Sequence, residues 1–345
     1  MSLNSKEWLS LVKEDAIEPD LPICDAHYHL HTSPDKSYMT EDFLRDTAGG
    51  HRVLQAVYVE ANSGYRPNDD IAMSPVGETE FVLAQRKTVE VRVPDIASGI
   101  VGFADLTLGK TVERVLAAHI AAGEGRFRGI RHLANWDASP VIMGNRVRQK
   151  GLLLDPKFRE GFAYLQKYGL SFDAWAFYPQ LRELLDLVQA FPETTIILEH
   201  IGGPIHIGPY AGKHQEVLRE WRQRISELAK CPNLFLKLGG LGMPTFGFDW
   251  DQRPMPPRSS EVAEAAAPYL LYCIEKFGVN RCMFESNFPV DKKAYSYTVV
   301  WNAFKLVTKD FSLDERSALF HGTAVKAYRL TTMTCPPKTI LDIVS

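Results

Sequence analysis

The sequence predicts an α/β protein built as a single (β/α)8 barrel of the TIM type, with an extension at each end. Apolar runs of strand type alternate with helix-period segments along nearly the whole chain, which is typical of a parallel sheet. Eight such runs occur, the number that closes this barrel, and the 345 residues suffice for one large barrel. An open, doubly wound sheet is the alternative. It has little support, because no G-x-G-x-x-G motif follows the first expected strand.

The alternation gives the elements in order. The expected strands cover residues 21–29, 53–60, 97–103, 127–133, 170–175, 195–200, 234–238 and 282–286. The expected helices cover residues 77–91, 112–122, 157–168, 181–191, 215–230, 260–277 and 297–309. Pro156, Pro179 and Ser259 lie near expected helix starts, where proline and capping side chains are favoured.

Two long loops and the chain ends complete the organisation. Residues 61–74 and the aromatic, proline-rich residues 239–258 either form pocket walls or pack on themselves. We assign residues 1–20 to an N-terminal extension, residues 21–332 to the barrel and residues 333–345 to a C-terminal tail.

The composition excludes several classes of protein. The chain carries 39 Lys and Arg against 42 Asp and Glu, a net charge of −3, so no nucleic-acid partner is expected. No apolar run reaches the roughly 18 to 20 residues of a membrane helix, and the charged first residues do not resemble a secretory signal. The five cysteines are odd in number and form no C-x-x-C motif, which indicates a reduced, cytoplasmic protein. A small-molecule substrate is the expected partner, and a homo-oligomer is left open.

The first expected strand ends in a cluster of histidines, Asp25-Ala26-His27-Tyr28-His29-Leu30-His31. Alternate residues of a strand share a face, so His27 and His29 should point the same way, at the end of the barrel where active sites lie. Two imidazoles on one face can ligate a divalent cation, and a hydrogen-bonded structural pair is the alternative. His31 should lie in the following loop, where it could orient a substrate.

Two later strands also end in polar side chains. An apolar strand runs into Glu199-His200 and a glycine turn, which places a third imidazole at the same end of the barrel. His200 is therefore a site residue or a structural histidine that caps the turn. Strand parity puts Glu285 and Asn287 on one face at the end of the eighth strand, with Asp291 in the loop that follows.

These motifs resemble the amidohydrolase superfamily. D-x-H-x-H on the first strand, E-H-x-G-G on the sixth and S-N-x-P after the eighth are similar to the "amidohydrolase 2" group of TIM-barrel hydrolases. That group includes sugar lactonases, the pyrone-dicarboxylate lactonase and related decarboxylases. The resemblance spans residues 23–330, where the closing helix start of the group is matched by Phe320-His321-Gly322-Thr323-Ala324.

The resemblance implies a mononuclear site in which His27, His29 and His200 hold one zinc or manganese ion. A metal-free site, as in some lactonases of this branch, is the alternative. A binuclear site is not expected, because the strand-four lysine is missing and Asp173 or Trp175 stands where the strand-five histidine is usual.

The usual strand-eight aspartate of the family, a metal ligand or general base, is replaced by Asn287, whose neutral amide cannot take a proton. A replacement base should lie nearby. Glu285 is the first candidate, Asp291 the second and Glu60, at the end of the second strand, the third. The alternative role for Glu285 is a buried ion pair with a cation of the fourth or seventh strand.

Cationic and aromatic side chains at strand ends predict how the substrate is bound. Arg131 and His132 end the fourth strand, and Lys237 lies on the seventh. Because the arginine fork pairs with carboxylates, an anionic substrate is expected, and structural salt bridges are the alternative. Trp175 would form an apolar wall.

We therefore predict a hydrolase of a small, carboxylated lactone, in which water attacks the carbonyl. Its predicted catalytic residues are His200, Asn287, Glu285 and Asp291. The first alternative is a metal-dependent decarboxylase of an aromatic or muconate-type acid on the same scaffold. The second is a barrel that binds a small molecule without catalysis, for which the loss of the aspartate at position 287 is the main support.

Overall fold

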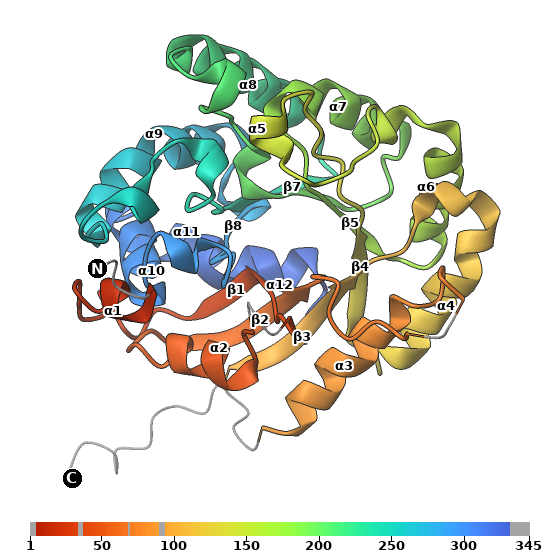
Figure 1. Ribbon diagram of the computed structural model, residues 1–345, viewed down its shortest axis with the longest axis horizontal. Coiled ribbons are helices and arrows are strands. Elements are labelled where there is room, and N and C mark those ends of the chain that lie inside the picture. Colours follow the sequence, from red (N-terminus) through yellow and green to blue (C-terminus); the bar gives the residue numbers. More distant parts are fainter. Residues whose placement is uncertain (1–4, 34–36, 68–69, 90–93, 332–345) are drawn as a thin grey trace.

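A computed structural model describes residues 5–33, 37–67, 70–89 and 94–331 of the chain. Eight parallel strands follow one another around a ring in chain order, and each pairs with the next (Figure 1). They are β1 (Ile23–Tyr28), β2 (Val53–Val59), β3 (Asp95–Gly102), β4 (Phe127–Arg131), β5 (Ser171–Ala174), β6 (Ile196–Leu198), β7 (Leu234–Leu238) and β8 (Cys282–Phe284). This sequential order confirms the predicted barrel and is incompatible with a doubly wound sheet.

Helices surround the ring of strands (Figure 1). They are α1 (Ser5–Leu9), α2 (Thr40–Thr47), α3 (Val76–Lys87), α4 (Glu113–Ala122), α5 (Pro140–Met143), α6 (Pro156–Lys167), α7 (Leu181–Ala190), α8 (His214–Leu228), α9 (Ser259–Phe277), α10 (Tyr297–Val307), α11 (Leu313–Ser317) and α12 (Thr323–Ala327). All seven expected helices are present. The remaining five have at most eight residues, too few to display a clear helical period in the sequence.

The barrel closes between its first and last strands through the backbone of the segment that follows β8. The His29 amide donates to the Phe288 carbonyl at 2.7 Å, and the Asn287 amide donates to the His27 carbonyl at 2.9 Å. The Ser286 amide donates to the Asp25 carboxylate at 2.9 Å. The residues that complete the barrel are thus the neighbours of the predicted site residues.

Apolar side chains fill the N-terminal half of the barrel interior, and α12 closes this end. The inner cluster combines residues of the strands with residues of α12 and the segment after it: Cys24, Ala26, Val57, Val59, Val101, Ile197, Phe235, Met283, Ala324, Ala327, Tyr328 and Leu330. The charged residues of the predicted site lie towards the other end, at the C-terminal ends of the strands, whereas Gln55 and Ser98 are buried polar groups near the closed end.

The segment before β1 packs against the barrel. The Trp8 indole donates to the Arg253 carbonyl at 2.9 Å, and the Lys305 ammonium donates to the carbonyls of Ile17 and Glu18 at 2.8 Å. The predicted tail, residues 333–345, lies outside the described residues, as does Cys335.

The aromatic loop of residues 239–258 packs largely on itself and on the barrel. The rings of Phe248 and Trp250 stack with centroids 4.5 Å apart, and Trp250 also meets Tyr295 edge-on at 5.6 Å. Phe246 is only 1% exposed. Of the two roles left open for this loop, self-packing is the one that these contacts favour.

Two expectations from composition can be compared with the described residues. The four cysteines they contain, Cys24, Cys231, Cys273 and Cys282, are all buried free thiols. Within the described ranges, the longest apolar helices fall short of what a bilayer crossing requires.

Candidate functional site

His27 and His29 lie together at the C-terminal end of β1, as the strand pattern predicts. Their Nε2 atoms are 3.0 Å apart, and both side chains are buried. The pairing of β1 with β2 shifts register between Asp25 and Tyr28, so β1 contains an extra residue beside the site. Such a bulge re-aims the side chains that follow it. It accounts for Ala26 and the adjacent His27 both facing the interior.

The Nδ1 atoms of these two rings face acceptors. His29 Nδ1 lies 2.8 Å from the Val59 carbonyl, so it must carry the proton. His27 Nδ1 lies 3.1 Å from Glu199 and 3.0 Å from Glu285, two carboxylates that also require a donor. Burial lowers the pKa of both imidazoles, and Lys237 lowers the pKa of His27 further. Burial therefore favours the neutral form of both rings, and His27 Nε2 faces Arg131 Nη1 at 3.4 Å.

His200 completes the group from the turn after β6. Its Nδ1 lies 2.6 Å from a Glu285 oxygen, and its ring centroid is 4.8 Å from that of His27. The backbone at His200 is left-handed, with φ of 53°, which ends the strand and swings the ring inward. Gly240 (φ +71°) faces this ring, and a Cβ at that position would lie 2.6 Å from His200 Cγ. A glycine is therefore required there.

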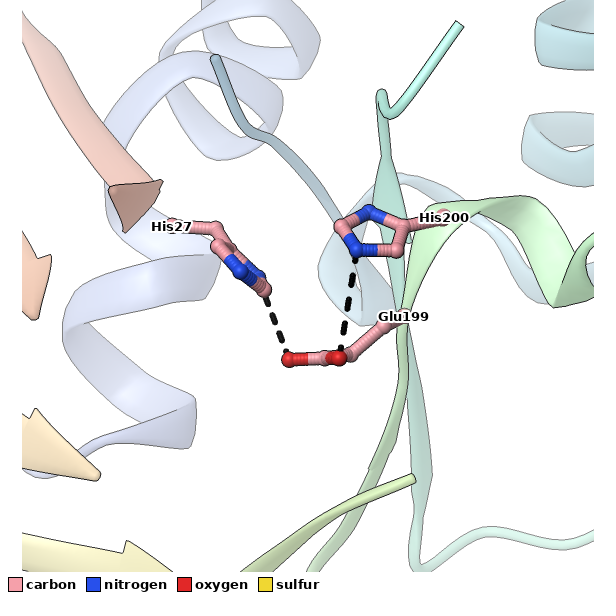
Figure 2. A group of neighbouring side chains, drawn as sticks. All are labelled: His27, Glu199 and His200. Atoms are coloured by element: carbon pink, nitrogen blue, oxygen red, sulfur yellow. Dashed lines mark ion pairs between the residues drawn. The ribbon is translucent and has the colours of Figure 1, made fainter. Parts of the chain in front are cut away.

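The three histidines fit a divalent cation. Each has Nδ1 engaged by an acceptor, which is how a carboxylate or carbonyl orients metal-ligating imidazoles. The Nε2 atoms face other groups of the site: that of His27 lies 3.4 Å from Arg131 Nη1, and that of His200 lies 3.9 Å from Glu199. The unshared lone pairs of His27 and His29, 3.0 Å apart, would repel each other without a proton or cation between them. Glu199 lies between His27 and His200 (Figure 2), and single ligand atoms from these three residues lie within 4.8 Å of one another. Nitrogen and carboxylate donors suit zinc.

The charges around His27 also call for a cation. Three carboxylates hold two permanent cations: Arg131 pairs with Glu60 at 2.8 Å and Glu199 at 3.2 Å, and Lys237 pairs with Asp173 at 2.7 Å and Glu199 at 3.3 Å. A fourth carboxylate, Glu285, pairs only with histidines. With neutral imidazoles, two negative charges remain. A single divalent ion would offset them.

Arg131 and Lys237 belong to this network. Burial opposes both charges, but the Glu60 and Glu199 carboxylates raise the pKa of Arg131, and Asp173 and Glu199 raise the pKa of Lys237. Lys237 is fully buried and also lies 3.0 Å from His27 Nδ1. The three protons of the Lys237 ammonium thus face Asp173, Glu199 and His27 Nδ1.

The segment after β8 departs from the predicted geometry. β8 ends at Phe284, and Asn287 has a φ of 55°, so strand parity does not relate Glu285 to Asn287. Glu285 holds His27 and His200 instead of Arg131 or Lys237. The Asn287 amide nitrogen donates to Asp291 Oδ1 at 2.8 Å, which leaves its oxygen free to accept.

Asp291 is held beside Asn287 in a buried position. Its Oδ2 accepts from the Tyr295 hydroxyl at 2.7 Å and from the Gly242 amide at 2.8 Å. Burial raises the pKa of this carboxyl to about 6, and these hydrogen bonds limit the rise. Asp291 is thus a carboxyl group that titrates close to neutral pH.

The remaining predicted substrate contacts are spread around the mouth. Trp175 meets the His200 ring edge-on at 4.7 Å, and His31 stacks against His29 at 5.9 Å. His132 points away from Arg131, against Phe103 and Phe158, and lines a separate cavity.

Sequence reasoning gave no role to Glu199, which contacts His27, Arg131 and Lys237. Burial opposes its ionisation, yet these partners hold the pKa of Glu199 well below its usual range. The sequence feature that could have indicated Glu199 is a carboxylate directly before a histidine at the end of a strand. Tyr328, which donates to Asp173 at 2.5 Å from the closed end of the barrel, had no such signal.

Several known proteins are similar to this chain over most of its length. The uncharacterised protein y4mH of Sinorhizobium fredii is 34% identical over 337 residues, which cover 90% of this chain and 99% of that protein. An L-fucono-1,5-lactonase of Burkholderia multivorans is 29% identical over 257 residues, 73% of this chain and 77% of that protein. An amidohydrolase of Burkholderia multivorans, solved with bound zinc, is 25% identical with a TM-score of 0.69, covering 90% of this chain and 99% of that one.

The family model described as amidohydrolase matches residues 24–330. The match includes every site residue described above. The chain therefore belongs to the amidohydrolase family.

Proposed function

We propose that this amidohydrolase-type enzyme hydrolyses a small lactone at a single divalent metal ion held by His27, His29 and His200. The observation that carries the proposal is the grouping of His27, His200 and Glu199 within 4.8 Å of one another, with His29 Nε2 3.0 Å from His27 Nε2. A bound zinc or manganese ion would polarise the ester carbonyl and lower the pKa of water toward roughly 7.

The relatives support this reading. The L-fucono-1,5-lactonases of two Burkholderia species are 29% and 25% identical to the chain, and zinc is bound in the amidohydrolase structure from Burkholderia multivorans. A lactone is a cyclic ester, so its hydrolysis requires a water, a proton acceptor and a stabilised oxyanion.

Asp291 is the carboxylate best suited to accept the proton of the attacking water. Its pKa, raised by burial to about 6, lies near working pH, where a general base is most effective. Glu285 is less suitable, because its interactions with His200 and His27 outweigh the effect of burial and hold its pKa far below the usual range. In this proposal Glu285 orients the two histidines, and the free amide oxygen of Asn287 orients the water.

The ion pairs of Arg131 and Lys237 bear on the charge of the substrate. Arg131 and Lys237 suggested an anionic substrate, but carboxylates already occupy both cations. Neither is thus available to a substrate carboxylate, so the described contacts do not favour a carboxylated lactone. Decarboxylation of an aromatic or muconate-type acid remains the alternative predicted from sequence. Neither cation is available to the carboxylate of such an acid either.

The test is metal content measured beside activity, on protein purified without chelating resin. We expect about one zinc or manganese ion per chain, hydrolysis of at least one lactone in a panel, loss of activity on chelation and recovery when the metal returns. His200→Ala should retain the fold, measured by circular dichroism, and lose turnover; near-wild-type activity would refute the assignment. Activity without metal would indicate that His200 and a carboxylate carry out the reaction without a metal ion. Release of carbon dioxide without lactone turnover would favour the decarboxylase.

A further inference from the structure

A polar cavity of about 290 Å³ opens at the mouth over the ends of β2, β3 and β4; we call it the β2–β4 cavity. Its lining includes Glu60, Asn62, Phe103, Asp105, Arg148 and Gln149. Binding and catalytic residues of such barrels come from the loops at this end.

The β2–β4 cavity adjoins the histidine site. Glu60, one of its lining residues, accepts from Arg131 Nε at 2.8 Å, and Arg131 Nη1 lies 3.4 Å from His27 Nε2. The residue before Glu60, Val59, provides the carbonyl that holds His29 at 2.8 Å. The side chains of Glu60 and Arg131 therefore link this cavity to the histidine pair, where the reacting carbonyl of a ligand would lie.

The lining of the β2–β4 cavity offers unused hydrogen-bonding capacity. Arg148 donates through Nη1 to the Val147 carbonyl at 2.9 Å, but its buried Nε has no partner among the described residues. Asn62 adds an amide group that both donates and accepts, and Gln149, whose Nε2 donates to Asp155 at 2.7 Å, adds its amide oxygen. Phe103 adds an aromatic surface.

The charges of the lining indicate the class of ligand. Glu60 is already paired with Arg131, so the remaining charges of the lining, those of Asp105 and Arg148, balance and offer an anion no net attraction. Hydroxyl groups, by contrast, donate to carboxylates and accept from arginine and amides. A cluster that mixes acceptors, donors and one aromatic ring matches a neutral compound rich in hydroxyl groups.

We propose that the β2–β4 cavity binds the hydroxylated carbons of a neutral, sugar-derived lactone whose ester carbonyl lies at His27 and His29. This inference rests on the proposed function and specifies its substrate class. The volume is at the lower end of the range for complete small-molecule sites, which suits part of a small ligand. Arg148 is then a specificity-determining residue.

A neighbouring cavity of about 610 Å³ is the natural comparison. It is lined by Trp136, Asp137, Ala138, Ser139, Pro140, Lys150, Pro179, Gln180, Glu183, Pro209 and Tyr210. None of these residues appears in the ion pairs around His27. Lys150, two residues from Arg148, therefore gives a matched control variant.

The test compares two matched six-membered esters: hydroxylated 1,5-lactones, of which L-fucono- and D-glucono-1,5-lactone are the probes, and δ-valerolactone, which lacks hydroxyl groups. In Arg148→Met we expect the ratio of kcat/KM values, hydroxylated over unsubstituted, to fall about tenfold, as for loss of one hydrogen bond from a charged donor. Lys150→Met should keep the wild-type ratio. An unaltered ratio in Arg148→Met, or a fall caused by Lys150→Met instead, would overturn the inference.

Binding measurements separate this inference from the proposed function. If the wild type hydrolyses neither class of lactone, the proposed function fails. Calorimetric titration with D-glucono-1,5-lactone then tests whether the cavity binds a hydroxylated lactone. Binding that weakens about tenfold in Arg148→Met and persists in Lys150→Met supports the cavity. Absence of binding, or equal binding by all three proteins, contradicts it.

Discussion

At the scale of single residues, the site depends on carboxylates that orient histidines. Glu285 holds His27 at 3.0 Å and His200 at 2.6 Å, so one side chain determines which nitrogen of each ring is free. Groups of this kind commonly affect metal affinity nearly as strongly as the ligands themselves. Two predictions follow from single side chains in this arrangement.

Glu285→Gln should weaken zinc binding about 10- to 100-fold, because the amide holds the two imidazoles less firmly and removes one negative charge. Competition with a chromogenic chelator measures the affinity. Glu220→Gln, an exposed change on α8, is the matched control and should leave the affinity at the wild-type value. Equal affinity in the two variants would show that Glu285 has no orienting role.

The acid limb of the pH profile should report Asp291. Burial raises its pKa to about 6, and only the ionised form accepts a proton, so kcat/KM should fall about tenfold per pH unit below about pH 6. Asp291→Asn should lower activity and remove this limb. Asp25 also has its pKa raised to about 6 by burial, so Asp25→Asn is the necessary control. Loss of the limb only in the Asp25 variant would assign it to that residue.

At the scale of elements, the sequence predicted the strands well and their ends less well. β7 spans the expected residues Leu234–Leu238, because a buried apolar run is a strong strand signal. β6 and β8 end before the predicted residues, because His200 and Asn287 adopt left-handed backbone conformations that no local sequence pattern predicts. Strand parity therefore cannot be used past those ends to relate Glu285 to Asn287.

The histidine ligands could be predicted from the sequence, whereas their partners could not. His27, His29 and His200 stand in recognisable motifs at strand ends. The register shift in β1 and the pairing of Lys237 with Asp173 and Glu199 depend on strands that are far apart in the chain. Such contacts are determined by the closure of the barrel, and one sequence contains no direct signal for them.

The segment after α12 contributes to the same network from the closed end of the barrel. Tyr328 donates to the Asp173 oxygen that also holds Lys237, and Lys237 lies 5.5 Å over the Tyr328 ring. Tyr328→Phe should lower the free energy of unfolding by about 1 to 3 kcal/mol, since a buried carboxylate loses a donor. Urea denaturation measures it, with Tyr164→Phe on α6 as the control. A difference below about 0.5 kcal/mol between the two variants would contradict this role.

At the scale of the whole molecule, the excess of two negative charges around His27 links metal binding to stability. A ligand that binds only the folded state stabilises it by about 2.7 kcal/mol at a hundred times its Kd. Zinc should therefore raise the melting temperature, and a chelator should reverse the shift. His29→Ala should abolish the shift, whereas His214→Ala, on α8, should preserve it. A shift of equal size in both variants would place the metal elsewhere.

The closure of the barrel by the segments around His27 and Phe288 has a consequence for synthesis of the protein on the ribosome. The proposed ligands and Glu285 come from the first, sixth and eighth strands. A nascent chain cannot assemble them until residue 285 has left the exit tunnel. A product shortened by premature termination before that point retains His27, His29 and His200, but it lacks the carboxylate that orients two of them. Acquisition of metal should therefore be among the last events in the maturation of the chain.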